Sequence, residues 1–385
     1  MTQTNLISTP EALQTLCTQL ADSDWLTLDT EFLREKTYYA QLCLIQVANA
    51  DSAVCIDAIA LNTAEALQPL FDLLFDPNIV KVFHASSQDL EIFYQLAGKV
   101  PEPIFDTQIA ATITGYGDQI GYANLVEKIE GVKLSKTQSR TDWSLRPLSN
   151  DQIAYALDDV TYLRDIYLKL DQALKDNGRV DWVKDDFEAI SRPQTYEPNI
   201  DTIWRKLRGA NKLHGVQLAA LQLLTRWREE TARSKNRPRR WIIKDDVLVD
   251  IARFMPKKEP ELGRLRGLDQ GTLKHSGAAL FAIIEQARQL SQDQWPDGTT
   301  AKPRLTANQD ALVDALMAVL RLVSANHKVS ASTLATRKEL EQVVHGDTEV
   351  PLLHGWRNAI AGDQVRALLE GKSKLAVDNG VLVLG

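Results

Sequence analysis

Two kinds of hydrophobic pattern alternate along the first 100 residues. Between residues 22 and 57, the segments WLTLDTEF, CLIQVA and AVCID are apolar or alternating and are separated by polar residues, which predicts three strands. A helical pattern follows over residues 62–75. IVKVFH at 79–84 predicts a further strand, which leads into a helix over residues 88–96 that stops at Gly98. Because strands and helices go on alternating, we expect an α/β first domain.

Residues 149–175 have the clearest helical pattern of the chain. Ser149 and Gln152 have the S-x-x-Q spacing of a capping box, which is typical of a helix N-terminus. The apolar stripe that follows is formed by Ile153, Leu157, Val160, Leu163 and Tyr167.

The C-terminal half is helical throughout. Residues 190–202 carry two prolines and little periodicity, so we interpret them as a linker. Residues 217–232 and the segment DDVLVDIARFM have helical spacing, and a second stretch of low periodicity at 291–306 precedes further helices. The two helical parts resemble a diverged repeat, in which each long helix is followed by a polar turn that contains an asparagine, Asn236 or Asn326. The tail VDNGVLVLG contains a short apolar run that the pattern does not assign.

The charge of the chain is unevenly distributed. The net charge of −7 argues against a nucleic-acid-binding protein, but residues 201–290 contain 19 basic and 10 acidic residues, whereas the remainder contains 25 basic and 41 acidic residues. A basic middle beside an acidic remainder fits a protein that binds phosphate in one place and metal cations in another.

Composition indicates a globular protein of the cytoplasm. The length of 385 residues predicts two or three domains, and 44% hydrophobic with 25% charged residues is ordinary for a soluble protein. We expect no secretory signal and no membrane helix, because no run approaches the ~18 apolar residues that a span needs. Three cysteines without a CxxC pair argue against disulfides and structural zinc, and we expect Cys43 and Cys55 to be small apolar strand residues.

Asp29 and Glu31 are the first candidates for chemistry. They lie at i and i+2 of a predicted strand, so their side chains point to the same face, while Leu28 and Thr30 face the other way. Two carboxylates at the end of an apolar strand are costly to bury unpaired, and a hard divalent cation is a natural partner. The alternative is a strand end that faces solvent.

A second and a third motif carry further carboxylates. Asp89 lies in the first turn of a predicted helix, where an acid can also simply complement the helix dipole. Tyr155 and Asp159 lie one turn apart on one face of the helix over 149–175, although a tyrosine in the core beside an exposed aspartate would have the same spacing. Asp158 points about 100° away around the helix, so we prefer Asp159.

The order of these motifs resembles that of the DEDD exonuclease superfamily in its tyrosine-bearing branch. The flanking segments LDTEFLREKTYYAQLCLIQVA, KVFHASSQDLEIF, FDTQIAA and QSRTDWSLRPLSNDQIAYALDDVTYL closely resemble the bacterial ribonuclease D family over residues 20–175. LHGVQLAALQLLTRWREETARSKNRPRRWIIKDDVLVDIARFMP resembles the first helicase-and-RNase-D C-terminal (HRDC) domain of that family, and residues 307–375 resemble the second less closely.

This resemblance implies both a fold and an activity. We expect a ribonuclease H-like mixed sheet with flanking helices over residues 1–192, followed by all-α HRDC bundles at 205–290 and 306–380. The implied activity is a 3′→5′ exoribonuclease that releases nucleoside 5′-monophosphates from RNA with a free 3′ end. The expected substrates are transfer-RNA precursors and other small structured RNAs, and the expected state is a monomer. By the resemblance, two divalent cations, Mg²⁺ or Mn²⁺, are bound by Asp29, Glu31, Asp89 and Asp159, and Tyr155 is the motif tyrosine of the catalytic site.

The basic residues of the middle region form a cluster between two predicted helices. We interpret it as an RNA-binding patch, against the alternative of a solvated loop, and expect the neighbouring Trp241 to lie in the core. The cluster consists of Arg233, Lys235, Arg237, Arg239 and Arg240.

The sequence also offers three alternative interpretations. Gly371-Lys372-Ser373 resembles the end of a P-loop, but Arg366 stands where the motif requires glycine, so we expect no nucleotide cofactor. A DNA exonuclease would carry nearly the same active-site motifs, whereas the flanks and domain order favour RNA. An inactive RNA-binding scaffold would lack a carboxylate, and all four are present.

His84 precedes the second motif, and we expect it to be structural or to line the cleft, not to be catalytic.

Overall fold

The computed structural model describes residues 5–135, 137–138, 141–298 and 304–385. These residues form two compact units. The first comprises the described residues in the ranges 1–32, 42–196 and 304–385, and the second those in 33–41 and 197–303.

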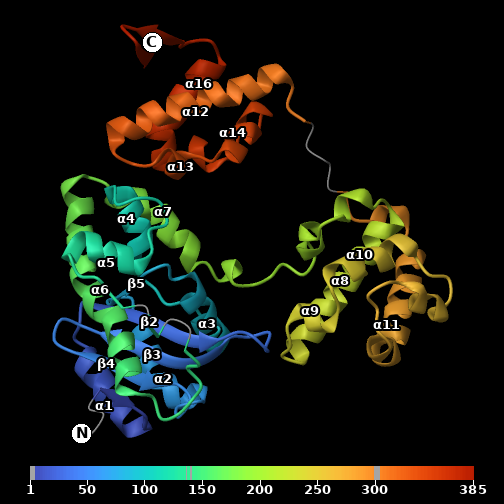
Figure 1. Ribbon diagram of the computed structural model, residues 1–385, viewed down its shortest axis with the longest axis horizontal. Helices are drawn as coiled ribbons and strands as arrows, with labels where there is room; N and C mark the ends of the chain where they lie inside the picture. Colours follow the sequence, from blue (N-terminus) through green and yellow to red (C-terminus); the bar gives the residue numbers. More distant parts are fainter. Residues whose placement is uncertain (1–4, 136, 139–140, 299–303) are drawn as a thin grey trace. The chain divides into compact units, whose positions relative to one another are not determined.

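The first unit is built on a six-stranded mixed sheet, as predicted (Figure 1). The strand order is β1-β4-β3-β2-β5-β6. β1 pairs with β4, β2 with β5 and β5 with β6 in parallel, whereas β3 and β4 are antiparallel. The strands are β1 (Leu6–Ile7), β2 (Trp25–Leu33), β3 (Gln41–Ala48), β4 (Ala53–Asp57), β5 (Val80–Phe83) and β6 (Ile104–Asp106).

Helices pack against the sheet through two separate hydrophobic cores. Leu26 and Leu28 of β2 enter the core that contains α1 (Pro10–Leu20), α2 (Ala64–Leu74) and α3 (Ser87–Ala97). The second core contains buried residues of α4 (Thr107–Thr114), α5 (Tyr122–Glu130), α6 (Asn150–Asp176) and α7 (Val180–Ser191). Because side chains alternate along a strand, Thr27 between these leucines points away from the first core.

Helix α6 confirms the capping box in the sequence. The Ser149 side chain accepts a hydrogen bond from the Gln152 backbone at 3.2 Å, and the Gln152 side chain accepts one from the Ser149 backbone at 2.8 Å. This reciprocal capping satisfies backbone N–H groups that the first turn leaves without helical partners. It therefore determines where the helix that carries Tyr155 and Asp159 begins.

The C-terminal helices of residues 304–385 share the second core of the nuclease sheet. Buried residues such as Leu320 and Leu352 belong to the same hydrophobic cluster as Leu163 of α6. Trp182 of α7 stacks on Trp356, with ring centroids 4.6 Å apart and an interplanar angle of 5°. The elements are α12 (Ala307–His327), α13 (Ala331–Leu334), α14 (Arg337–Val344), α15 (Gly355–Arg357) and α16 (Asp363–Leu369). The tail that the pattern did not assign forms an antiparallel hairpin of β7 (Leu375–Asp378) and β8 (Val381–Leu384).

The second unit is helical around a core of its own. α8 (Val216–Ser234), α10 (Asp245–Phe254) and α11 (Gln270–Gln289) surround buried residues that include Trp204, Leu224 and Ile284. The short helix α9 (Arg239–Ile242) contributes no buried residue to this core. The expectation that Trp241 lies in the core is wrong, because its side chain is 60% exposed. The short helix α9 is followed by Ile243, which enters this core instead. Among the described residues, no helix combines the length and apolar character that a membrane span requires.

Candidate active site

Strand β2 places two carboxylates opposite helix α6. The hydroxyl group of Thr27 donates a hydrogen bond to the Val160 backbone carbonyl at 2.9 Å, so this face of β2 lies against α6 one residue from Asp159. Asp29 and Glu31 follow at i+2 and i+4 from Thr27, on the same face. One carboxylate oxygen each of Asp29, Glu31 and Asp159 lies within 4.8 Å of the other two. Two carboxylates from a strand and one from a helix thus come together in a single oxygen-lined site.

Asp89 lies beside this cluster at the start of α3. The residue is 7% exposed, and its carboxylate accepts a hydrogen bond from the hydroxyl group of Thr30. Thr30 points to the face of β2 opposite Asp29 and Glu31, as the alternation predicted. From that face its hydroxyl group contacts Asp89. Asp89 is not one of the three residues whose oxygens converge, although its charge acts on both Asp29 and Glu31.

The carboxylates destabilise one another's charged forms. Burial, followed by the charges of Asp89, Asp159 and Glu31, raises the pKa of Asp29 well above its usual range. Burial together with the Asp159 and Asp89 charges raises the pKa of Glu31 to about 8. Burial raises the pKa of Asp159 to about 7. Burial likewise raises the pKa of Asp89 to about 7, although the hydrogen bond from Thr30 acts in the opposite direction.

This electrostatic environment fits a divalent cation. A cluster of one buried and three half-buried acids without a compensating charge is costly, and each takes up a proton readily in response. An all-oxygen donor set of carboxylates is the kind that Mg²⁺ and Mn²⁺ prefer. The residues present therefore fit a metal site in both charge and donor chemistry.

Tyr155 lies one helical turn before Asp159 and packs against Trp143. The ring centroids of Trp143 and Tyr155 are 6.2 Å apart with an interplanar angle of 36°. Burial and the Asp159 charge raise the pKa of Tyr155 above its ordinary value. The phenol is therefore protonated at neutral pH and can serve as a hydrogen-bond donor.

Arg146 anchors the loop that carries Trp143. Its guanidinium binds both carboxylate oxygens of Asp57 at 2.7 Å and donates to the backbone carbonyls of Trp143 and Cys43 at 2.8 Å. Sequence reasoning missed this support, and it also missed the Thr30 hydrogen bond. The only signal was that Arg146 lies in a segment that matches the family resemblance.

His84 and Tyr122 lie close to the site without joining the carboxylates. The ring nitrogens of His84 are 3.0 Å from the Thr107 hydroxyl oxygen and 3.0 Å from the Ile120 carbonyl oxygen. Burial lowers the pKa of His84, so the ring is neutral and has a structural role. Tyr122 donates to the Asp158 carbonyl oxygen at 2.9 Å, and the Asp158 carboxylate is not part of the cluster.

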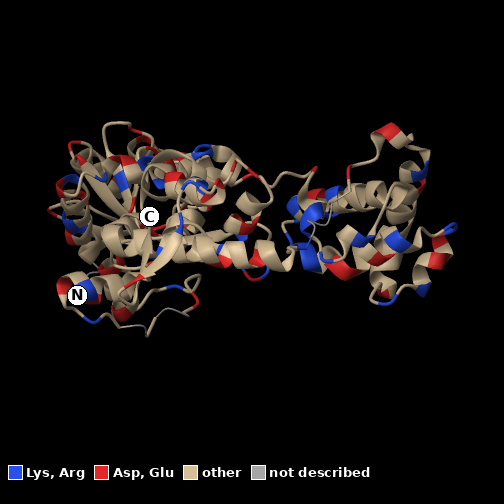
Figure 2. Cartoon of the chain, turned by 90° about the horizontal axis from the view of Figure 1, so that it is seen from above, with Lys and Arg blue, Asp and Glu red and all other residues tan. Residues whose placement is uncertain are grey.

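The basic patch predicted in the second unit divides into two groups. Arg239 forms an ion pair with Glu229, and Arg233 lies 3.6 Å from the same carboxylate. The other three side chains are exposed, in a unit that carries charges of both signs (Figure 2): Lys235, Arg237 and Arg240.

Comparison with known proteins identifies the family. Residues 4–175 match the family described as 3′-5′ exonuclease, and residues 217–284 match the HRDC domain. Ribonuclease D of Nitrobacter hamburgensis is 41% identical over 381 residues, which cover 98% of each chain. The chain belongs to the ribonuclease D family. Ribonuclease D of Bartonella henselae is 40% identical and covers 97% of this chain and 92% of its own length.

A solved structure supports the same assignment to ribonuclease D. The structure of Escherichia coli RNase D, described as an exoribonuclease involved in structured RNA processing, has a TM-score of 0.85 to this chain. It is 33% identical and covers 95% of this chain and 98% of its own. As a ribonuclease D family member with the 3′-5′ exonuclease domain, the chain is a hydrolytic exoribonuclease. The two family matches lie inside the predicted ranges 1–192 and 205–290.

Proposed function

We propose that the chain removes nucleotides one at a time from the 3′ end of RNA and releases nucleoside 5′-monophosphates with the help of two divalent cations. The observation that carries this proposal is the convergence of oxygens from Asp29, Glu31 and Asp159, with the buried Asp89 beside them. Family membership supports the direction of the reaction, and the charge of the site supports the cofactor.

The residues have separate roles in this proposal. Asp29, Glu31 and Asp159 would hold one cation, and Asp29 and Asp89 the second. Bound cations neutralise phosphate charge and lower the pKa of a coordinated water, which is the chemistry that phosphodiester hydrolysis needs. The protonated phenol of Tyr155 donates a hydrogen bond that orients the attacking water. Trp143 and Arg146 position Tyr155 through the loop before α6.

The second unit supplies RNA contacts in the same proposal. Lys235, Arg237 and Arg240 bind backbone phosphates, and the exposed indole of Trp241 offers a surface on which a base can stack. Arg233 and Arg239, which the sequence placed in the same patch, contribute mainly to a structural network. We further propose that residues 306–380 are a second HRDC-like domain. Transfer-RNA precursors are the proposed physiological substrates of a monomeric, cytoplasmic enzyme.

The test uses a 5′-labelled RNA with a single-stranded 3′ tail, incubated with purified protein in Mg²⁺ or Mn²⁺. A matched DNA and the Asp29→Asn variant are run in parallel. We expect a ladder that shortens from the 3′ end, with released 5′-monophosphates and no products from the variant. An intact RNA beside a degraded DNA would favour a DNA exonuclease, and two intact polymers in both metals would refute the proposal.

A further inference from the structure

The short segment between strands β2 and β3 belongs to the same compact unit as the HRDC domain. Residues 33–41 connect β2 to β3, and they cluster with residues 197–303. Glu31 of the carboxylate site lies only two residues before this segment. The chain therefore passes directly from the metal-binding strand into a set of contacts with helix α8.

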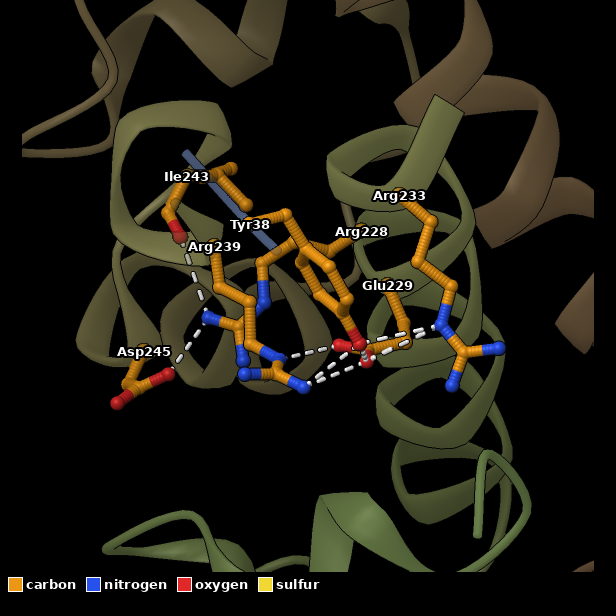
Figure 3. A network of polar contacts seen from close by, with 7 residues as sticks. All are labelled: Tyr38, Arg228, Glu229, Arg233, Arg239, Ile243 and Asp245. Atoms are coloured by element: carbon orange, nitrogen blue, oxygen red, sulfur yellow. Dashed lines mark hydrogen bonds and ion pairs between the residues drawn. The ribbon is translucent and has the colours of Figure 1, made fainter. Parts of the chain in front are cut away.

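The side chain of Tyr38 is the centre of these contacts. Figure 3 shows its hydroxyl group meeting the Glu229 carboxylate, with Arg239 and Arg233 on either side. The hydroxyl donates to Glu229 and accepts from Arg239 at 2.9 Å and from Arg233 at 3.1 Å. A tyrosine hydroxyl has one donor and two acceptor positions, so this hydroxyl is fully used.

Glu229 depends on these partners. Glu229 is 1% exposed, and Arg239 binds both of its carboxylate oxygens. Burial opposes ionisation, but the hydrogen bonds from Arg239 and Tyr38 outweigh it and lower the pKa of Glu229. A buried carboxylate that loses such partners is strongly destabilised, so the contacts of Tyr38 are not incidental to the surface.

The backbone of the segment is held as well. The side-chain oxygen of Asn236 accepts hydrogen bonds from the backbone N–H groups of Tyr38 and Tyr39, both at 3.1 Å. Asn236 has a positive φ of 45° in the turn between α8 and α9. The guanidinium of Arg239 also lies 4.7 Å from the centre of the Tyr38 ring. The side chain of Tyr38 is thus bound by α8 and α9, and the backbone of the segment is bound by the turn between these helices.

We propose that the contacts of Tyr38 with Glu229 and Asn236 keep residues 33–41 bound to the HRDC-containing unit, and that this attachment lowers the KM of the enzyme for long RNA. The inference rests on the proposed function. Cleavage of a dinucleotide needs only the carboxylate site, whereas a long RNA also meets the HRDC phosphate contacts. Two binding surfaces on one molecule reinforce each other only when their geometry permits simultaneous engagement. Tyr38 and Glu229 are therefore positioning residues for the distal part of the RNA.

The test compares two substrates on full-length protein. The variants are Tyr38→Phe, which keeps the ring, and the stronger Tyr38→Ala/Asn236→Ala double variant. Arg226→Ala is the matched control, because Arg226 lies on the same helix in an exposed ion pair with Asp201. KM and kcat are measured on a dinucleotide and on a 30-nucleotide RNA with a single-stranded 3′ tail. We expect the KM for the long RNA to rise about tenfold in the double variant and less in Tyr38→Phe. The reason is that affinity falls when two linked binding surfaces no longer engage the RNA together. The kinetics on the dinucleotide, and the control on both substrates, should stay unchanged.

A second measurement reports on the attachment of residues 33–41 itself. Trypsin cleaves after basic residues, and Lys36 lies exposed within the segment. We expect faster cleavage after Lys36 in the double variant than in the parent or in Arg226→Ala. Equal losses on both substrates, or an unchanged KM for the long RNA, would overturn the inference. A parent enzyme that degrades neither substrate would instead refute the proposed function.

Discussion

The hydroxyl group of Thr30 donates a hydrogen bond to the carboxylate of Asp89, which lies 59 residues further along the chain. Strand β2 therefore restrains three acids: it carries Asp29 and Glu31 on one face and holds Asp89 from the other. A hydrogen bond to a metal-binding carboxylate from the surrounding shell of residues orients that carboxylate and tunes its affinity.

Removal of this hydroxyl should weaken metal binding. Thr30→Val keeps the volume of the side chain but cannot donate to Asp89. We expect a loss of about 10- to 100-fold in Mn²⁺ affinity or in activity at limiting metal. Metal titrations of exonuclease activity measure this effect. Thr225→Val, which removes a buried hydroxyl that donates to the Leu221 carbonyl in the other unit, should leave the titration unchanged. An unaltered titration for Thr30→Val would show that Asp89 needs no such support.

Adjacent aspartates on α6 should differ sharply in importance. Asp159 contributes an oxygen to the carboxylate cluster, whereas Asp158 does not. We expect Asp159→Asn to reduce kcat/KM by on the order of 1000-fold, because a metal site contributes several kcal/mol to catalysis and each 1.36 kcal/mol is tenfold. Asp158→Asn should retain activity within a few fold. Comparable losses in both variants would contradict the assignment of Asp159.

The stability of the metal-free protein should fall as the pH rises. The pKa of Glu31 is raised to about 8, those of Asp89 and Asp159 to about 7, and that of Asp29 well above its usual range. Unfolded carboxyl groups titrate near pH 4, so between about pH 4 and 8 the folded state binds more protons than the unfolded state. Linkage then requires that the free energy of unfolding decrease as the pH rises through this window.

Thermal unfolding in EDTA between pH 5 and 8.5 tests this sign. Asp29→Asn should flatten the pH profile and raise the Tm at pH 8 by about 2–4 °C for each kcal/mol of repulsion removed. Mg²⁺ should stabilise the parent most at pH 8, because metal binding requires ionised carboxylates. A metal-free protein that gains stability from pH 5 to 8 would contradict the repulsion among these acids.

Tyr155 should act on the chemical step without binding metal. Its raised pKa keeps the phenol protonated, so Tyr155→Phe removes a donor and leaves the carboxylates intact. We expect kcat to fall on the order of 100-fold, as for loss of a group that assists proton transfer, with an unchanged metal midpoint. Tyr162→Phe on the same helix is the matched control. If the metal midpoint shifted with kcat, Tyr155 would instead be supporting the metal site.

Short-range features of the fold were predictable because local forces decide them. The capping box of Ser149 and Gln152 determines the start of α6 within a few residues. The i, i+2 spacing of Asp29 and Glu31 and the i, i+4 spacing of Tyr155 and Asp159 each follow from backbone geometry. Hydrophobic periodicity was therefore sufficient to predict an α/β first domain and the helices of the HRDC region, whereas the mixed sheet was implied by the family resemblance.

Long-range features could be seen only in the tertiary structure. Asp57 and Arg146 are 89 residues apart, and nothing in either segment indicates that they pair. Trp241 was wrongly predicted to be buried, because a large apolar side chain favours burial. In the structure Trp241 is exposed, and Ile243 contributes to the core around Trp204 instead. The size of a side chain shows how much apolar surface it has, but not whether the fold buries that surface.

By itself, the sequence determined the identity of the acids, their pairwise spacing and the elements that carry them, because strand and helix periodicities act over a few residues. Tertiary structure alone decided that Thr30 holds Asp89, that Tyr38 leaves the nuclease unit for Glu229, and that residues 304–385 share the core behind α6. Those pairings depend on which surfaces remain to be buried once the elements have formed. Many combinations satisfy the same hydrophobic pattern, and only packing in three dimensions selects among them.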